Sequence, residues 1–177
     1  MKMCSGVCMA ATDCHDLVIA DAGPLIHLDE LGCLDLLKDF TRVLVPEAVW
    51  FEVEKHRPTA LTGLSLERVQ TEAADPRVAT LSLTFTLHRG EREALTLLSR
   101  YPYALFLTDD TAARLAAQAL SARVHGTLGL VVRAFRRGQR SKDEVIGLLR
   151  AIPECTTLHI RPSLLSEVIG QVEAAGE

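Results

Sequence analysis

The chain has 177 residues, of which 48% are hydrophobic and 24% are charged, and its formal net charge is -4. This length suits one domain, and the apolar fraction is that of a folded globular protein, which excludes a mainly disordered chain. No apolar run reaches the roughly 18 residues of a transmembrane helix, and the start lacks the long apolar region of a signal peptide. We therefore expect a cytoplasmic protein with no membrane partner.

The first residues differ from the rest of the chain. We expect residues 1–16 to be a poorly ordered leader and residues 17–177 to form a single domain, because chain ends are commonly loose. Cys4, Cys8 and Cys14 favour a zinc site only weakly, since they form no close CxxC pair. Disulfides are not expected in a cytosolic chain.

From residue 17 onward, short apolar runs alternate with amphipathic segments. Strands are predicted at 17–20, 42–45, 66–71, 103–108 and 123–125. Helices are predicted at 24–37 with a break near Gly32, and at 46–56, 76–86, 88–100, 110–119, 127–138, 142–151 and 162–174. This alternation is typical of βαβ units. It predicts a three-layer α/β fold, with a mainly parallel central sheet and helices on both faces.

Two of the predicted strands end directly in acidic residues. Asp21 follows the first strand, and Asp109 and Asp110 follow the strand at 103–108. Ligands of open α/β sheets bind beyond the carboxyl ends of the strands, near the point where strand order reverses. If the two strands are neighbours, these acids share one crevice. The alternative is that each aspartate caps the helix that follows it.

Two predicted helices add further acids. Glu52 lies three residues after Val49, and Glu91 lies four residues before Leu95, so both share the apolar face of their helices. Glu93 lies roughly on the opposite side of its helix from Glu91.

An acid on an inward face must be paired, protonated or bound to a metal. The candidate inward acids are Asp21, Glu52, Glu91 and Asp109. Crowded carboxylates suit Mg²⁺ or Mn²⁺, which lower the pKa of water and stabilise a phosphate leaving group. The alternative is that these residues are separate helix caps and surface acids.

At these residues the sequence resembles the PIN-domain family of metal-dependent ribonucleases, in its VapC-like branch. The stretches that carry the resemblance occur in the family's order and span about residues 17–138. They are 18–26 (VIADAGPLI), 45–52 (VPEAVWFE), 90–95 (GEREAL), 107–114 (LTDDTAAR) and 126–129 (GTLG).

The resemblance implies an acidic pocket that binds one or two Mg²⁺ or Mn²⁺ ions and hydrolyses RNA phosphodiester bonds with metal-activated water. By position, it assigns the catalytic and metal-binding roles to Asp21, Glu52, Glu91 and Asp109, with Asp110 as a further metal ligand. Many such proteins are toxins that a small antitoxin protein restrains, and many are homodimers. We therefore expect an RNA substrate, an antitoxin partner and a homodimer.

Several cationic and hydroxyl side chains are candidates for substrate binding. Each also has a simpler explanation, as a solvated helix residue, a helix N-cap or the polar side of an amphipathic helix. They are Arg114, Thr127, Arg133, Arg136 and Arg137.

Two other functions compete with the ribonuclease. The first is a PIN-like regulatory or binding protein with weak or no nuclease activity, although all four candidate acids are present. The second is a doubly wound domain that binds a nucleotide. It is disfavoured because the sequence has neither a GxGxxG fingerprint nor a Walker Gly-Lys-Ser/Thr motif.

Overall fold

The structure is a computed structural model, and it describes residues 17–71 and 75–175. The predicted leader at 1–16, with its three cysteines, lies outside the described residues. None of the helices in the described ranges is long and apolar enough to cross a membrane.

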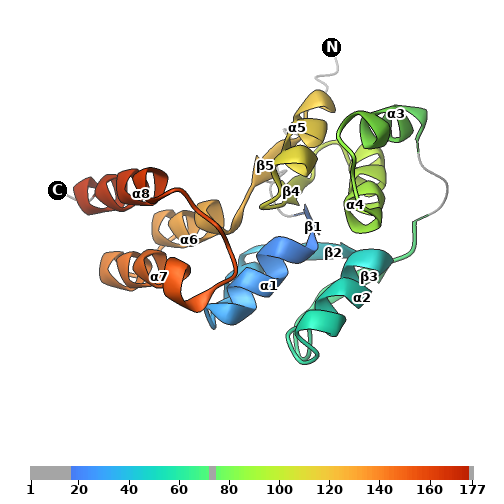
Figure 1. Cartoon of the computed structure of the whole chain (residues 1–177). Coiled ribbons are helices and arrows are strands. Elements are labelled where there is room, and N and C mark those ends of the chain that lie inside the picture. Colours follow the sequence, from blue (N-terminus) through green and yellow to red (C-terminus); the bar gives the residue numbers. More distant parts are fainter. Residues whose placement is uncertain (1–16, 72–74, 176–177) are drawn as a thin grey trace, which may run out of the picture.

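Five parallel strands make up the sheet formed by the described residues, in the order β3-β2-β1-β4-β5 (Figure 1). The chain runs outward from the centre through β1 and β2 to β3, then crosses back to β4 and β5, so strand order reverses between β1 and β4. The strands are β1 (Leu17–Ala20), β2 (Arg42–Pro46), β3 (Leu66–Val69), β4 (Leu105–Leu107) and β5 (Arg123–His125).

Side chains of the central strands alternate between two cores. Val18 and Ala20 of β1 belong to one core and Ile19 to the other, and all three are fully buried. A strand covered on both faces is expected to be apolar throughout, as the run LVIA is.

The helices divide between the two cores. Those that pack in the core with Val18 are α1 (Ala22–Glu30), the 3-10 helix η1 (Leu34–Asp39), α2 (Glu47–His56), α6 (Thr127–Arg136), α7 (Lys142–Cys155) and α8 (Pro162–Ala174). Those that pack in the core with Ile19 are α3 (Pro76–Thr84), α4 (Arg89–Arg100) and α5 (Thr111–Ala119). The predicted three-layer α/β fold is confirmed.

The structure also refines several predicted boundaries. The break near Gly32 is present, and the glycine adopts a φ of 65°, a conformation that L side chains rarely adopt. Strand β4 is shorter than predicted, because residues before it form a turn in which the Ala104 N–H donates to the Tyr101 carbonyl at 2.9 Å. Helix α7 continues beyond its predicted end at Ala151 to Cys155.

Candidate active site

Strands β1 and β4 lie side by side, as the shared crevice requires. The Asp21 N–H donates to the Leu107 carbonyl at 2.9 Å, which continues the β1–β4 pairing to the ends of both strands. The acids that follow the two strands therefore emerge at the same edge of the sheet, at the point where strand order reverses.

A cavity of about 370 Å³ opens at this edge. It is lined by segments from both strand ends and from the first turns of α1 and α4, together with one residue of α2 and part of the α7–α8 linker. The five carboxylates singled out from the sequence all line it: Asp21, Glu52, Glu91, Asp109 and Asp110.

Asp21 lies at the bottom of this acidic pocket, with 7% of its surface exposed. One carboxylate oxygen accepts the Ala22 N–H and the other accepts the Thr108 hydroxyl, each at 2.9 Å. The pKa of Asp21 is raised to about 7, mainly by burial and to a lesser extent by the charges of Glu91 and Glu52, while the two hydrogen bonds act in the lowering direction. Asp21 is thus both the N-cap of α1 and a buried, perturbed acid.

Glu91 and Glu52 come from the neighbouring helices α4 and α2, and both line the pocket. Glu91 is partly buried, and its pKa is raised mainly by that burial and also by Asp110 and Glu52. One of its oxygens accepts the His88 N–H at 2.6 Å in the capping box of α4. Glu52 is exposed rather than inward, so it lies at the mouth of the pocket and not inside it.

Asp109 and Asp110 have different surroundings. Asp109 accepts three hydrogen bonds: from His27 Nδ1 at 2.8 Å, from the Thr127 N–H at 2.8 Å and from the Thr127 hydroxyl at 2.6 Å. Asp110 caps α5 by accepting the Ala113 N–H at 2.8 Å, and it is exposed to the pocket. Its charge, and not that of Asp109, is the one that acts on Glu91.

Thr127 is not the N-cap of α6. The cap is Gly126, and the Thr127 side chain turns to Asp109 instead. A Cβ at position 126 would lie 2.5 Å from an Asp109 oxygen and 3.1 Å from an Arg114 nitrogen. Glycine is therefore needed for the close approach of α6 to the strand end.

The predicted substrate-binding arginines separate into two groups. Arg133 and Arg137 both pair with Asp39 of η1, with N–O distances of 2.7 and 3.2 Å, and neither lines the acidic pocket. Arg136 is exposed and lies outside it as well. Arg114 instead lies close to the site, where it donates to the Thr108 carbonyl at 3.1 Å.

Glu93 has a partner that its position on the helix did not predict. Although it lies opposite Glu91 on the helical wheel, its carboxylate accepts the Ala48 N–H at 2.9 Å and pairs with Arg89. It therefore satisfies the N-terminus of α2, which packs against α4.

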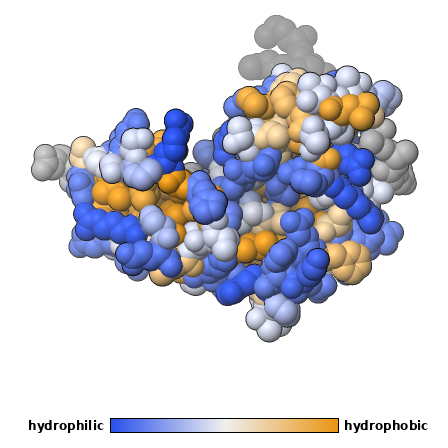
Figure 2. Space-filling model, viewed as in Figure 1, coloured by the Kyte–Doolittle hydropathy of each residue, from blue (hydrophilic) through white to orange (hydrophobic). Residues whose placement is uncertain are grey.

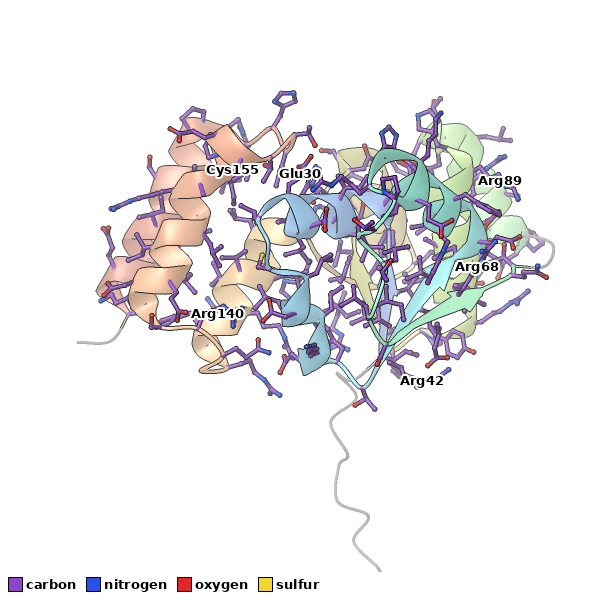
Figure 3. The ribbon with its side chains drawn as sticks, turned by 90° about the horizontal axis from the view of Figure 1, so that it is seen from below. Glu30, Arg42, Arg68, Arg89, Arg140 and Cys155 are labelled. Atoms are coloured by element: carbon purple, nitrogen blue, oxygen red, sulfur yellow. The ribbon has the colours of Figure 1, made fainter. Side chains whose placement is uncertain are left out.

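One wall of the pocket was not predicted. The linker between α7 and α8 contributes Thr157, Leu158 and His159. Glu30, at the end of α1 (Figure 3), holds this linker by accepting the Thr157 N–H at 2.8 Å. His27 and His88 also line the pocket. The linker has no periodic pattern or motif that would have revealed it.

The donor set fits a hard divalent cation. All five acids offer carboxylate oxygens, and the raised pKa values of Asp21 and Glu91 reflect burial and crowding that a cation would relieve. Within residues 17–71 and 75–175, no three His, Cys, Asp or Glu side chains are grouped as ligands of one ion. Mg²⁺ commonly uses only one or two carboxylates and retains several waters, so the chemistry of the pocket remains suited to it.

One comparison with known proteins gave a match. Neither the curated proteins nor the solved structures gave a significant match. A family model described as a PIN domain matches residues 17–174, which include every strand and every acid of the pocket. PIN domains are typically metal-dependent nucleases. With its fold, its acidic pocket and this match over nearly the whole chain, the protein belongs to the PIN-domain family.

Proposed function

We propose that this protein is an Mg²⁺- or Mn²⁺-dependent endoribonuclease that hydrolyses RNA phosphodiester bonds in the acidic pocket. The observation that supports this most directly is Asp21, a buried carboxylate with a pKa near 7, among other acids at the strand ends. A perturbed acid in a pocket at the switch point of a parallel sheet is a typical active-site feature.

We assign the metal ligands by what each carboxylate already binds. Asp21 accepts two hydrogen bonds and Glu91 and Asp110 accept one each, so all three retain lone pairs for an ion, and Glu52 at the mouth of the pocket would orient water. Asp109, which the family pattern placed among the ligands, already accepts three hydrogen bonds, so we assign it the positioning of the start of α6.

An Mg²⁺ or Mn²⁺ ion held by these carboxylates would supply water activation and charge neutralisation at the phosphate. The protein residues hold the carboxylates in place and restrict access. The N–H groups of Ala22 and His88 fix the orientation of Asp21 and Glu91, and the linker residues Leu158 and His159 close one side. The site therefore needs no Ser, Cys or His nucleophile.

The test is cleavage of a short single-stranded RNA by the purified protein in Mg²⁺ or Mn²⁺. Asp21→Asn keeps the shape of the side chain but removes one anionic ligand, so activity should fall about a hundredfold or more. Asp143→Asn, at an exposed position on α7, is the matched control and should keep full activity. Undiminished cleavage by folded Asp21→Asn protein, or cleavage in excess chelator, would refute the mechanism. RNA binding without any cleavage would favour a regulatory protein.

We further propose that the activity is that of a toxin, restrained by a small antitoxin protein, and that the protein is a homodimer. The support is the resemblance of its motifs to VapC-like toxins. Induced expression should arrest growth, and the product of an adjacent small reading frame should restore it. Asp21→Asn should not arrest growth. Sedimentation of the purified protein as a monomer would contradict the dimer.

A further inference from the structure

A second hollow lies beside the acidic pocket. Its volume is about 460 Å³, and it is bounded by α5, the β5–α6 turn, the start of α8 and the α7–α8 linker. Figure 2 shows the surface hollowed between the α8 side and the α5 side of the molecule. Asp109, Leu158 and His159 line both cavities, so the second hollow adjoins the acidic pocket along the linker, and we call the two together the groove.

The charge of the groove changes along its length. The acidic pocket holds five carboxylates, whereas the second hollow has Arg114 and Arg161 with the single carboxylate Asp109. That carboxylate already accepts three hydrogen bonds from His27 and Thr127. The second hollow is therefore a cationic extension of the site.

These two arginines lack the acidic partners that most other arginines have. Arg114 bonds only to a backbone carbonyl, and Arg161 forms no ion pair in the described ranges. By contrast, Arg133 and Arg137 share Asp39. Positive charge that is not neutralised by the protein is available to an anionic ligand.

Two further observations indicate a positive field in the second hollow. Burial lowers the pKa of His125, and the charges of nearby arginines, Arg133 and Arg114 first among them, lower it further. Helices α5, α6 and α8 all begin around the hollow, and the N-terminal ends of helices favour anions.

We propose that the second hollow binds the phosphate backbone of a single RNA strand whose neighbouring phosphodiester lies in the acidic pocket, a proposal that rests on the proposed ribonuclease function. The strand would cross the linker at Leu158 and His159 and reach Arg114 and Arg161. A cavity of a few hundred Å³ admits a ligand of one or two nucleotides and not a duplex. Histidine rings such as those of His125 and His159 suit the stacking of unpaired bases.

Arg114 and Arg161 are the arginines that would contact RNA, whereas Arg133 and Arg137 would not. The sequence pattern singled out the basic side of α6, but the structure pairs Arg133 and Arg137 with Asp39, and neither side chain lines the groove, although the charge of Arg133 acts on His125. Arg161, which the pattern did not single out, lies exposed at the groove. Its substitution removes a charge without opening the core.

The experiment measures binding of a fluorescent single-stranded RNA to the full chain by anisotropy in excess chelator, over a range of salt concentrations. The chelator keeps a metal-dependent reaction from consuming the RNA. For one lost phosphate contact, Arg161→Ala should make the negative slope of log affinity against log salt shallower by about 0.7 and weaken binding about fivefold near 0.1 M salt. Arg161→Glu should weaken it more.

The control is Arg92→Ala. Arg92 is exposed on α4, lies outside the groove, and has no carboxylate partner in the described ranges. It should leave the slope and the affinity unchanged. Equal losses for Arg92→Ala and Arg161→Ala would overturn the proposal, since they would reflect net charge alone. An unchanged slope for both Arg161 variants would overturn it as well.

Two comparisons distinguish RNA binding at the second hollow from binding of an acidic protein segment and from the proposed nuclease activity. If Arg161→Ala weakens binding of polyglutamate as much as that of RNA, the hollow accepts an acidic protein segment and the RNA proposal is wrong. If the wild-type protein binds RNA with the expected Arg161 dependence but does not cleave it in Mg²⁺ or Mn²⁺, the proposed nuclease function fails while the RNA path remains supported.

Discussion

Asp21 should make the metal-free protein less stable as pH rises. Its pKa is raised from 3.8 to about 7 on folding, so the folded state holds a proton that the unfolded state loses. The stabilisation is fully present below about pH 4 and is lost as pH increases to about 7. A shift of about three units, at about 1.4 kcal/mol per unit, corresponds to about 4 kcal/mol.

Asp21→Asn removes this ionisation and also weakens the acceptor for the Thr108 hydroxyl. One such hydrogen bond contributes about 1 kcal/mol. The variant should therefore be about 3 kcal/mol more stable than wild type near pH 8, and about 1 kcal/mol less stable near pH 4. The two stability curves should cross between these values.

Urea unfolding in excess chelator, at pH steps between these limits, measures both free energies of unfolding by linear extrapolation. Asp143→Asn, on the exposed first turn of α7, controls for the loss of a carboxylate elsewhere. A difference between wild type and Asp21→Asn that does not change with pH would show that the folded protein does not retain this proton, and the reasoning about burial would be wrong.

Three further predictions concern the metal, the close approach at α6 and the linker. Mg²⁺ binding should release nearly one proton at about pH 6 and almost none at about pH 8, because Asp21 must ionise to bind the ion. Calorimetry in buffers of different ionisation enthalpy measures the number of protons released. Proton release that does not vary with pH would contradict this prediction. Gly126→Ala should destabilise the fold by about 1–3 kcal/mol in chemical unfolding, since the new Cβ displaces Asp109; a neutral effect would show that the start of α6 yields easily. Glu30→Ala removes the acceptor for Thr157 and should speed hydrogen exchange in the α7–α8 linker, with unchanged exchange as the opposing result.

The parts of the site that the sequence predicts are those controlled by local pattern. An apolar run that ends in an acid places Asp21 and Asp109 at strand ends, and the alternation of strands with helices makes the sheet parallel. The helical period places Glu91 at the start of the buried side of α4. These features depend on residues close together in the chain and not on packing between distant segments.

The remaining features depend on packing between distant segments. The helical period treats each helix alone, so it assigned Glu93 away from the buried side although α2 begins next to it. It also assigned Arg133 to a free basic surface, whereas Asp39 of a 3-10 helix neutralises it. The linker at Thr157 is held at the site by Glu30, 127 residues earlier, and by the packing of Leu158 and Ile160 against the core.

The separation of the strands also determines when the site forms during synthesis. Thr108 bonds to Asp21 across 87 residues of chain. The ribosome adds about 5–20 residues per second. Thr108, at the end of β4, therefore leaves the ribosome about 4 to 17 seconds after Asp21, at the end of β1. Strand β1 pairs with β2 much earlier, but its other edge stays open until β4 arrives. The linker wall comes later still, so a nascent chain completes the pocket only after Thr157, Leu158 and His159 have been synthesised.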